Sequence, residues 1–491
     1  MKLLLNVYLP LLPLEALCPR WCDPAPRVVI DQGRVLAMSR EAARAGVRHG
    51  MRATGVLAIT PETLFLERSP DKEAAALEAI ATALMRYTPE VAFEEDFSIL
   101  LDVSASLRLF GGPHALALGV HRSVTALGFT VQLGAAPTAY GAWLLSRSRR
   151  LKGQLLRRRV LSMASLTRRL GLLPCGLVPA AVPFDAWLND VGARNLGALR
   201  RLPRAGLLRR TSKPLLAALD RAYGEAPEMF EWLRPPLQFS ARIETFERVE
   251  HAEALLHGAA GLVLQLVGWL AAVQQSVRML AFYLEHERGH AAVPPTLLEI
   301  RLGEPSWREE HMMRLLKERL AKVALSAPVI ALRLAAPEVE PMAPPNATLF
   351  PEPGGAPEDF ARLLELLSAR LGAEYVLVIE DVDDHRPEVC NAWVPATARQ
   401  ARSQVEEILD GRPFWLFPKP IKLILRDNRP FYGGSMLKIV AGPERLEAGW
   451  WSDQTEARDY YKAQGSEGAC YWIYLERVSG DLRWYAHGLF G

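Results

Sequence analysis

The chain has 491 residues, which is enough for several domains with separate hydrophobic cores. Hydrophobic residues make up 50% of it and charged residues 23%, a composition that fits a globular protein and excludes a disordered or fibrous one. The longest apolar run, 259–273, is interrupted by Gly and Gln, and Asn6 and Pro10 break the apolar start of the chain. We therefore expect no membrane span, no secretory signal and a cytoplasmic location.

Five scattered cysteines indicate reduced thiols, and no second ligand pair follows Cys18 and Cys22 at the interval of a zinc site. We therefore expect no metal and no cofactor. The net charge of +3 conceals two stretches, 147–169 and 194–213, that hold many cations and no acid. Solvated helix faces normally carry both signs, so these stretches predict a polyanionic partner, with nucleic acid as the first candidate.

The first part of the chain predicts a series of strands and helices. An apolar strand covers 3–8, and a hairpin joins 27–30 to 34–38. A helix is expected over 71–87, a central strand from Phe97 to Leu101, a helix over 114–127 and a strand over 130–134. Asp102, Ser104 and a Gly-Gly pair mark the end of the central strand.

The central stretch carries a family resemblance. Residues 94–112 resemble the palm strand of Y-family (translesion) DNA polymerases, in which a Ser-x-Asp-Glu-x-x-x-Asp-Val-Thr pattern places an adjacent Asp-Glu pair on the metal ions. Aligning 101–104 with the end of that pattern puts Phe97 at the catalytic Asp position and Ser98 at the Glu position. The third metal carboxylate, in the first strand, corresponds to Asn6, whose neutral oxygen does not replace a charge for Mg²⁺.

The nucleotide-binding motifs depart from the family in the same way. Residues 39–51 are similar to the fingers motif and keep its Gly-Val and Gly-Met frame, but Arg40 and Ala43 stand where the family has its triphosphate-gripping Tyr and Arg. Residues 134–146 resemble the motif Gly-Ile-Ala-x-Asn-Lys-x-Leu-Ala-Lys, with Ala139 and Trp143 in place of its lysines. Two-metal phosphoryl transfer needs anionic ligands, so this joint loss implies a retired active site.

If the central strand had a different register, the chain could still be an active polymerase. Glu95, Asp96 and Asp102 would supply carboxylates if the central strand were shifted by one residue. Such a slip turns every side chain of the strand to the opposite face. Because the buried pattern sets the register, the unshifted alignment is favoured.

Residues 183–203 have the spacing of a helix-hairpin-helix, a motif that clamps the DNA backbone and reads no bases. We expect a tight glycine turn followed by a second helix whose backbone N–H groups point at a phosphate. A plain helical pair is the alternative, but the basic flank and the match to the family's thumb favour DNA. The DNA-binding candidates are Gly192, Arg194, Asn195, Arg200 and Arg201.

Beyond Pro235-Pro236, six segments follow in β-α-β-β-α-β order between 243 and 334, which predicts a four-stranded sheet covered by two helices and matches the family's little finger. A Pro- and Gly-rich linker comes next, and a short peptide within it resembles the Gln-Leu-Ser/Asp-Leu-Phe peptide with which bacterial proteins enter the pocket of the sliding clamp (β). The alternative is that its apolar pair docks on its own domain. The peptide is Asn346, Ala347, Thr348, Leu349 and Phe350.

The tail from Asp359 onward is β-rich and aromatic, with aromatic clusters at 415–417, 450–451, 460–461 and 484–490. Together with the preceding motifs, it resembles the ImuB family, the Y-family-like member of the bacterial damage-inducible mutagenesis cassette, over essentially the whole chain. The resemblance implies an α+β multidomain fold, a Y-family polymerase-like right hand (palm, fingers, helical thumb, βαββαβ little finger) plus a β-rich C-terminal domain. The expected domains are a palm at 1–165 with a fingers insertion at about 28–70, a thumb at 166–236, a little finger at 240–336, a linker at 337–357 and a partner-binding domain at 358–491.

The function that this resemblance implies is a non-catalytic adapter in DNA-damage-induced (SOS) mutagenesis and translesion synthesis. Such an adapter binds DNA and the sliding clamp and recruits the RecA-like protein ImuA and an error-prone C-family DNA polymerase. The last two partners follow from the family alone. Two alternatives stay open: an active translesion polymerase with shifted metal ligands, and a DNA-binding remnant without a clamp contact.

Overall fold

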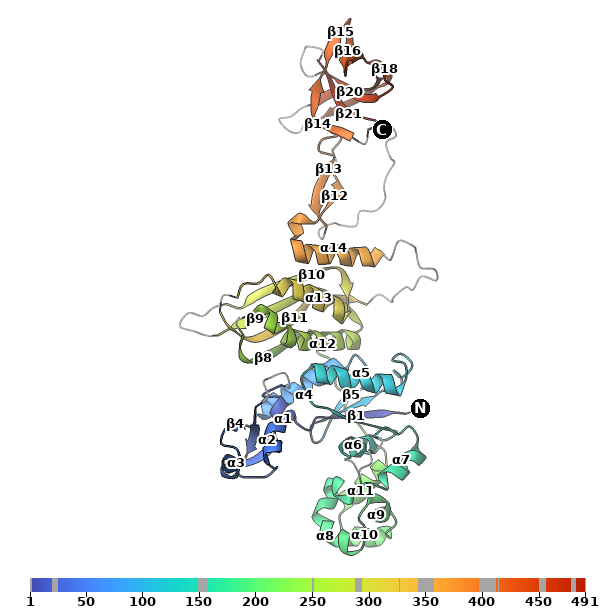
Figure 1. Cartoon of the computed structure of the whole chain (residues 1–491). Coiled ribbons are helices and arrows are strands. Elements are labelled where there is room, and N and C mark those ends of the chain that lie inside the picture. The colour runs from blue at the N-terminus through green and yellow to red at the C-terminus, as the bar shows by residue number, and fades with distance from the viewer. Residues whose placement is uncertain are drawn as a thin grey trace. The chain divides into compact units, whose positions relative to one another are not determined.

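The computed structural model describes residues 2–19, 25–148, 158–249, 251–287, 294–325, 327–342, 357–382, 384–396, 412–413, 415–449, 456–477 and 483–490. The chain divides into two compact units, 1–370 and 371–491. Figure 1 labels their helices and strands. We keep the names palm, fingers, thumb and little finger for the parts of the first unit to which the sequence assigned them, and the second unit contains the β-rich C-terminal part.

The palm is built on an antiparallel sheet of order β5-β6-β1-β7. One face packs against helices α4 and α5, and the other face is covered by α6 and by a segment that contains Phe230 and Trp232. Figure 1 shows α5 and α6 on opposite sides of β1. The elements are β1 (Leu4–Tyr8), α4 (Pro70–Leu84), β5 (Val91–Glu94), β6 (Ser98–Asp102), α5 (Pro113–Ala126), β7 (Gln132–Ala136) and α6 (Ala139–Arg147).

Burial on both faces explains the sequence of the first strand. Leu4 and Asn6 on one face and Leu5 and Val7 on the other are all at most 1% exposed. A strand that is covered on both sides loses the usual alternation of apolar and polar residues. Asn6 is therefore a buried polar group inside an apolar strand, and its partners decide what the site can do.

The expected start of the central strand is wrong by one residue. The strand begins at Ser98, and residues 95–97 form the loop of the β5–β6 hairpin, in which Glu94 pairs with Ser98. Asp96 and Phe97 have φ values of 54° and 56°, in the left-handed region that tight hairpin loops require. Glycine or asparagine normally marks such a loop. Neither is present here, so the apolar pattern of the sequence assigned Phe97 to the strand.

The fingers are a small sheet of order β3-β2-β4 with two short helices. The predicted hairpin of β2 and β3 is confirmed, with Val28 opposite Met38. A small core gathers beneath it around Val28, Val35 and Val56. The elements are α1 (Leu12–Glu15), which precedes the fingers, β2 (Arg27–Asp31), β3 (Arg34–Met38), α2 (Arg40–Ala45), α3 (Ala53–Ile59) and β4 (Leu64–Glu67).

The thumb is helical and has its own core, which consists mainly of leucines and includes residues of α6. Its helices are short and follow one another closely. Prolines at 174, 179, 203 and 214 stand at or beside helix starts, where the missing N–H costs nothing. The helices are α7 (Met163–Leu170), η1 (Cys175–Leu177), η2 (Pro179–Phe184), α8 (Asp185–Asp190), α9 (Leu196–Arg200), α10 (Arg204–Arg210) and α11 (Lys213–Ala222).

The little finger confirms the expected β-α-β-β-α-β order, with an antiparallel sheet of strand order β10-β9-β11-β8. Its core joins the two helices to one face of the sheet. Helix α12 is long and apolar enough to span a membrane by length and composition, although a shorter, interrupted run was expected; 61% of it is buried against protein. The elements are β8 (Ser240–Val249), η3 (Ala252–Leu255), α12 (Leu256–Val273), β9 (Gln275–His286), β10 (Thr296–Ser306), α13 (Glu309–Leu320) and β11 (Val329–Pro341).

Helix α14 (Pro357–Leu371) follows the linker and packs back on the little finger through a buried carboxylate. Glu365 is 6% exposed, and its Oε1 accepts from the backbone N–H of Gly303 at 2.7 Å. Its Oε2 lies 2.6 Å from Nε2 of His311 in α13. Ala369 adds an apolar contact with the little-finger core. The linker therefore leaves and re-enters the same domain.

The second unit consists of a hairpin and two further sheets. Strands β12 and β13 form the hairpin; the sheets have the orders β14-β21-β20-β19-β18 and β15-β16-β17. Two apolar clusters form their cores, one around Ile473 and one around Tyr460. The elements are η4 (Ala373–Tyr375), β12 (Leu377–Asp381), β13 (Asn391–Pro395), β14 (Trp415–Lys422), β15 (Ile424–Arg426), β16 (Arg429–Tyr432), β17 (Ser435–Met436), β18 (Lys438–Ala448), β19 (Glu456–Gln464), β20 (Cys470–Glu476) and β21 (Arg483–Leu489).

Replacing Glu365 by alanine tests the attachment of α14. Loss of this buried acceptor leaves its hydrogen-bond donors unpaired and costs roughly 3 kcal/mol, so we expect amide protection across 362–370 to fall by about two orders of magnitude in hydrogen exchange. Glu310→Ala, at an exposed position of α13, is the matched control and keeps full protection. Equal protection in the two variants would mean that the Glu365 contact does not hold the helix.

Candidate functional site

The palm brings together two of the three residues that the resemblance assigns to metal positions. Strands β1 and β6 are antiparallel, with Asn6 opposite Leu100 and Tyr8 opposite Ser98, so Asn6 and Ser98 point to the same face of the sheet. Both side chains are fully buried, and Ser98 Oγ lies 3.5 Å from Asn6 Oδ1. Phe97 stands in the hairpin loop, and its ring packs against the apolar core on the α4–α5 side.

The guanidinium of Arg147, the last residue of α6, lies against this face. Its Nη2 donates to Ser98 Oγ at 2.9 Å and to the Asp96 carbonyl at 2.9 Å. A longer bond of 3.3 Å joins the same nitrogen to the Glu95 carbonyl. The hairpin loop therefore presents its main-chain oxygens, and not its carboxylates, to the cation.

Two aromatic rings stack on the same guanidinium. The Cζ of Arg147 lies 4.0 Å from the centre of the Tyr8 ring and 3.6 Å from the centre of the Trp143 ring. Such stacking stabilises a guanidinium that has left bulk water. Burial lowers the pKa of Arg147 to about 10, so the group stays charged at neutral pH.

Asn6 is held from the other side by α6. Ser146 Oγ lies 2.9 Å from Asn6 Oδ1, and Arg147 Nη1 donates to the same hydroxyl at 3.2 Å. Helix α6 reaches this position because Gly134, opposite Asn6 in β7, has no side chain. A Cβ there would lie 2.1 Å from the carbonyl oxygen of Ala142, closer than atoms approach. Gly134, which stands at the glycine of the family's Gly-Ile-Ala motif, thus sets the distance between helix and sheet.

These residues do not fit a pair of magnesium ions. Mg²⁺ binds anionic oxygens in octahedral geometry, whereas Asn6 and Ser98 offer neutral oxygens. A fixed cation that hydrogen-bonds to Ser98 also repels any second cation beside it. In chemical terms, the site has a positive guanidinium where the family pattern has negative carboxylates.

The shifted register would use the carboxylates of Glu95, Asp96 and Asp102 as metal ligands, but Asp102 lies apart from the other two. The side chains of Glu95 and Asp96 are exposed at the hairpin loop. Asp102 is at the other end of β6, where its Oδ1 accepts from the N–H and the hydroxyl of Ser104. Four residues of strand separate it from Ser98, about 13 Å at 3.3 Å per residue. The structure therefore gives Asp102 a role in the turn and does not bring it to the loop.

Glu94, at the end of β5, lies opposite Ser98 in the register of the hairpin. Burial raises its pKa, and the neighbouring charges of Glu228 and Glu95 raise it further, while Arg221 and Arg147 act in the opposite direction. Burial therefore disfavours the charged form of this carboxyl, which is the form that would bind a cation.

An internal carboxylate also occupies the start of α6. Glu228 accepts from the backbone N–H groups of Ala139 and Tyr140, each at 2.8 Å, and Thr138 Oγ1 accepts from Gly141 at 3.2 Å. A helix N-terminus attracts anions. The resemblance assigned a triphosphate-contacting lysine to the position of Ala139, and here the N–H groups beside it already bind Glu228.

The predicted helical hairpin of the thumb is present. Helices α8 and α9 flank a turn in which Gly192 has a φ of 76°, and Asn195 caps α9 by accepting from Ala198 N–H at 2.8 Å. The expected phosphate contact through backbone N–H groups is wrong. Leu196 N–H donates to the carbonyl of Leu173 and Gly197 N–H to that of Gly171, both in the segment after α7.

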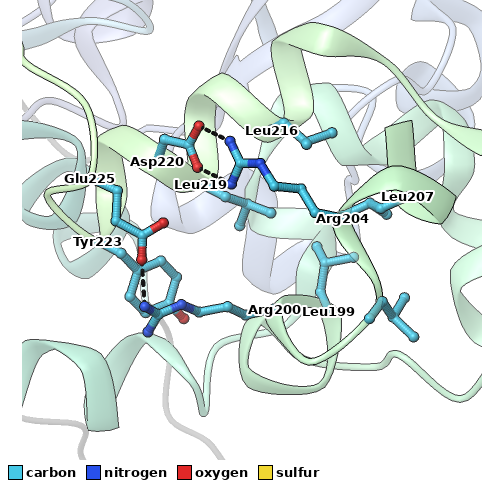
Figure 2. Close-up of a pocket in the computed structure, with 10 residues that line it drawn as sticks. Leu199, Arg200, Arg204, Leu207, Leu216, Leu219, Asp220, Tyr223 and Glu225 are labelled. Carbon is cyan, nitrogen blue, oxygen red and sulfur yellow. Dashed lines mark hydrogen bonds and ion pairs between the residues drawn. The ribbon is translucent and has the colours of Figure 1, made fainter. Parts of the chain in front are cut away.

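The arginines of the hairpin lie on the surface but are not all free. Arg194 and Arg201 are exposed. Figure 2 shows Arg200 paired with Glu225, and Arg204 held by Asp220, at the edge of a pocket of about 160 Å³ with a leucine floor. Hydrogen bonds from Arg204 lower the pKa of Asp220. Two of the cations that suggested a polyanion site are therefore balanced by acids.

The clamp-like peptide, Asn346 to Phe350, lies outside the described residues. Its flanks are both attached to the little finger. Met342, just after β11, donates its N–H to the Gln274 carbonyl at 3.0 Å, and α14 packs through Glu365.

Comparisons with known proteins show what the chain is similar to. The impB/mucB/samB family (IMS) matches residues 17–147. Protein ImuB of Caulobacter vibrioides is 27% identical over 473 residues, which covers 91% of this chain and 100% of that protein. The chain is therefore similar to Protein ImuB over nearly all of its length. A second relative is DNA polymerase IV 2 of Mesorhizobium japonicum, 28% identical over 240 residues that cover 47% of this chain and 53% of that protein.

Solved structures resemble the chain over about two thirds of its length. A Dbh ternary complex has a TM-score of 0.39 at 16% identity, and DinB from Sulfolobus solfataricus has a TM-score of 0.39 at 15% identity. Each covers 68% of this chain and 98% of its own.

Two residues that complete this site, Arg147 and Glu228, were not predicted from the sequence. Arg147 counted as one of a run of surface cations, and Glu228 lay in a segment without a motif. A signal for Arg147 exists: it ends a helix in which every residue from Gly141 to Ser146 is buried, and it follows Trp143 by four positions, which places the two on one face.

Replacing Arg147 by alanine leaves Ser98 and the loop carbonyls without their donor. Breaking such a charge-assisted network costs about 2–4 kcal/mol, so we expect a lower free energy of unfolding for the palm in urea. Tryptophan fluorescence reports this transition, since Trp143 contacts Arg147. Arg168→Ala, at an exposed position of α7, is the control and leaves the midpoint unchanged. An unchanged midpoint for both variants would contradict the structural role of Arg147.

Proposed function

We propose that this chain is a non-catalytic, polymerase-like adapter in DNA-damage-induced mutagenesis and translesion synthesis, acting in the cytoplasm. The observation that carries the proposal is the guanidinium of Arg147, hydrogen-bonded to Ser98 and stacked on Tyr8 where the family pattern has metal ligands. A fixed cation surrounded by neutral oxygens supports a palm that has lost phosphoryl transfer and kept its fold.

DNA binding is the first function of the adapter. The thumb from 163 to 225 has ten Lys and Arg and four Asp and Glu, a net charge of +6. Arg194, Arg201 and Arg209 are exposed, which supports contacts with phosphates. We propose that side chains make these contacts, with Gly192 and Asn195 fixing the turn and its cap.

Attachment to the sliding clamp is the second function. The peptide Asn346 to Phe350 stands in a linker whose two ends are held by one domain. We propose that Leu349 and Phe350 enter the clamp pocket. ImuA and the error-prone C-family polymerase are the further partners that the resemblance to the ImuB family implies, and we assign them to 358–491. Each attachment raises the effective concentration for the next.

We also propose the domain limits expected from the sequence, a palm to 165, a thumb to 236 and a little finger to 336. One observation favours a second candidate function, an active polymerase. The carboxylates of Glu95 and Asp96 are exposed in the loop beside Ser98, within reach of a hydrated ion.

Primer extension on a lesion-free template separates the two functions. With protein free of host polymerases, we expect no incorporation in Mg²⁺ or in Mn²⁺, because the carbonyls and not the carboxylates face the site. The same preparation binds primer-template, and Arg201→Glu with Arg209→Glu weakens that binding and lowers its salt dependence. Lys317→Glu with Arg319→Glu, exposed on α13, is the charge-matched control. Incorporation that disappears in a Glu95→Ala, Asp96→Ala variant would establish the enzyme instead.

Clamp binding is tested by replacing Leu349 and Phe350 with alanine. We expect co-elution with the sliding clamp in gel filtration to disappear, because a peptide that enters a pocket depends on its apolar anchors. Met229→Ala with Leu237→Ala removes two apolar side chains that are 93% and 100% exposed and should co-elute like the unmodified protein. Unchanged co-elution of the Leu349, Phe350 variant would leave a DNA-binding protein without this tether.

A further inference from the structure

The second unit contains a small three-stranded meander with an unusual outer face. Strands β15, β16 and β17 are joined by two-residue turns, Asp427-Asn428 and Gly433-Gly434. All four turn residues have positive φ, between 47° and 83°, as in the hairpin turns that match strand twist. The meander is therefore well defined, and its two faces can be assigned from the register.

One row of side chains crosses the outer face. Ile424 lies opposite Phe431, and Phe431 lies opposite Met436, so the three share one side of the sheet. Ile424 is 65% exposed and Met436 is 44% exposed. The alternate positions turn the other way: Pro430 is buried, and Tyr432 packs against the core of the larger sheet.

Exposed apolar side chains also occur on the next strand. After Met436 the chain enters β18, where Ile439 and Val440 are 44% and 56% exposed; as neighbours in a strand they point to opposite faces, so they do not both extend the row. Strand β18 is an edge of its sheet. Contiguous exposed apolar side chains on a folded domain are uncommon and mark surfaces that bind a partner. Neither core of this unit includes Ile424, Phe431, Met436, Ile439 or Val440.

Cations surround the row. Between 422 and 440 the chain has four of them, Lys422, Arg426, Arg429 and Lys438, against one acid, Asp427, a net charge of +3. All four are exposed. Arg426 and Arg429 pair across the strands on the same face as Ile424. An apolar row with a cationic border is complementary to a segment with apolar side chains and acidic neighbours.

We propose that this outer face of β15, β16 and β17 binds an acidic protein segment through that segment's aliphatic side chains. Single-stranded DNA fits the face less well, although it also seeks cations. Bases stack on open aromatic rings, and the one ring in the row, Phe431, has the Arg426 guanidinium 4.2 Å above it. The remaining members are aliphatic and offer no stacking surface.

The inference deepens the adapter function and rests on the partner-binding role proposed for 358–491. It names a surface and the chemistry of its occupant. DNA binding by the thumb and clamp binding by the linker use other parts of the chain, so failure here leaves those two functions intact and measurable.

The full-length protein is used to select from a displayed library of random peptides. We expect the selected peptides to be enriched in Asp and Glu next to Leu, Ile and Val. Individual synthetic peptides from the selection should bind at least tenfold more weakly to Ile424→Ser, Met436→Ser protein, because loss of central apolar contacts dominates such interfaces. Their binding should also weaken in Arg426→Glu, Arg429→Glu protein and between about 50 mM and about 500 mM NaCl.

Two controls separate a local effect from unfolding. Leu109→Ser removes a leucine that is 81% exposed in the other unit, and Lys317→Glu with Arg319→Glu reverses two exposed charges there; both should bind the peptides normally. Circular dichroism and clamp co-elution confirm that each variant is folded. The proposal is overturned if no peptide is selected, if the selected peptides lack acids, or if the Ile424, Met436 variant binds them unchanged. Loss of oligo-dT binding in that variant, with peptides unaffected, would assign the face to single-stranded DNA.

Discussion

The palm depends on one cation and the oxygens that surround it. Arg147 donates to the hydroxyl of Ser98 and to two loop carbonyls, and the rings of Tyr8 and Trp143 stack on its faces. A guanidinium has five N–H donors in a fixed plane, so it can serve several neutral acceptors at once. Ser98 and the loop carbonyls therefore have a donor without a carboxylate in the network.

A charged side chain of the protein also occupies the start of α6, where Glu228 accepts hydrogen bonds from the backbone N–H groups. Helix α6 therefore binds an anion of the chain at its first turn and carries a cation of the chain at its last. Both arrangements follow the helix dipole, which favours negative charge at the N-terminus and positive charge at the C-terminus. The helix reaches the sheet because Gly134 offers no Cβ. One small residue in β7 thus controls the position of both charged ends.

Regular elements were predictable from the sequence because their signals are local. The little finger's strand and helix order and the hairpin of β2 and β3 follow from apolar periodicity and turn residues. The start of β6 was not predictable, because Asp96 and Phe97 adopt positive φ without the usual glycine. The contacts of the site were not predictable either. Arg147 meets a loop about fifty residues earlier, and the N–H groups of α9 meet the segment after α7.

The charge that the folded surface presents was also not predictable from the sequence. The arginine runs suggested a polyanionic partner, but in the folded thumb Arg204 pairs with Asp220 and Arg200 pairs with Glu225. On the little-finger sheet, Arg242 pairs with Glu285 and Arg278 with Glu340. A run of one sign in the sequence therefore overstates the charge that a folded surface presents.

The return of α14 to the little finger has a mechanical consequence. The chain contacts the little finger at Met342 and again at Glu365. A partner that pulls on residues beyond 371 therefore transmits its force through the Glu365–His311 contact into the little finger. As long as that contact holds, a pull on the end of the chain is not passed on to Met342.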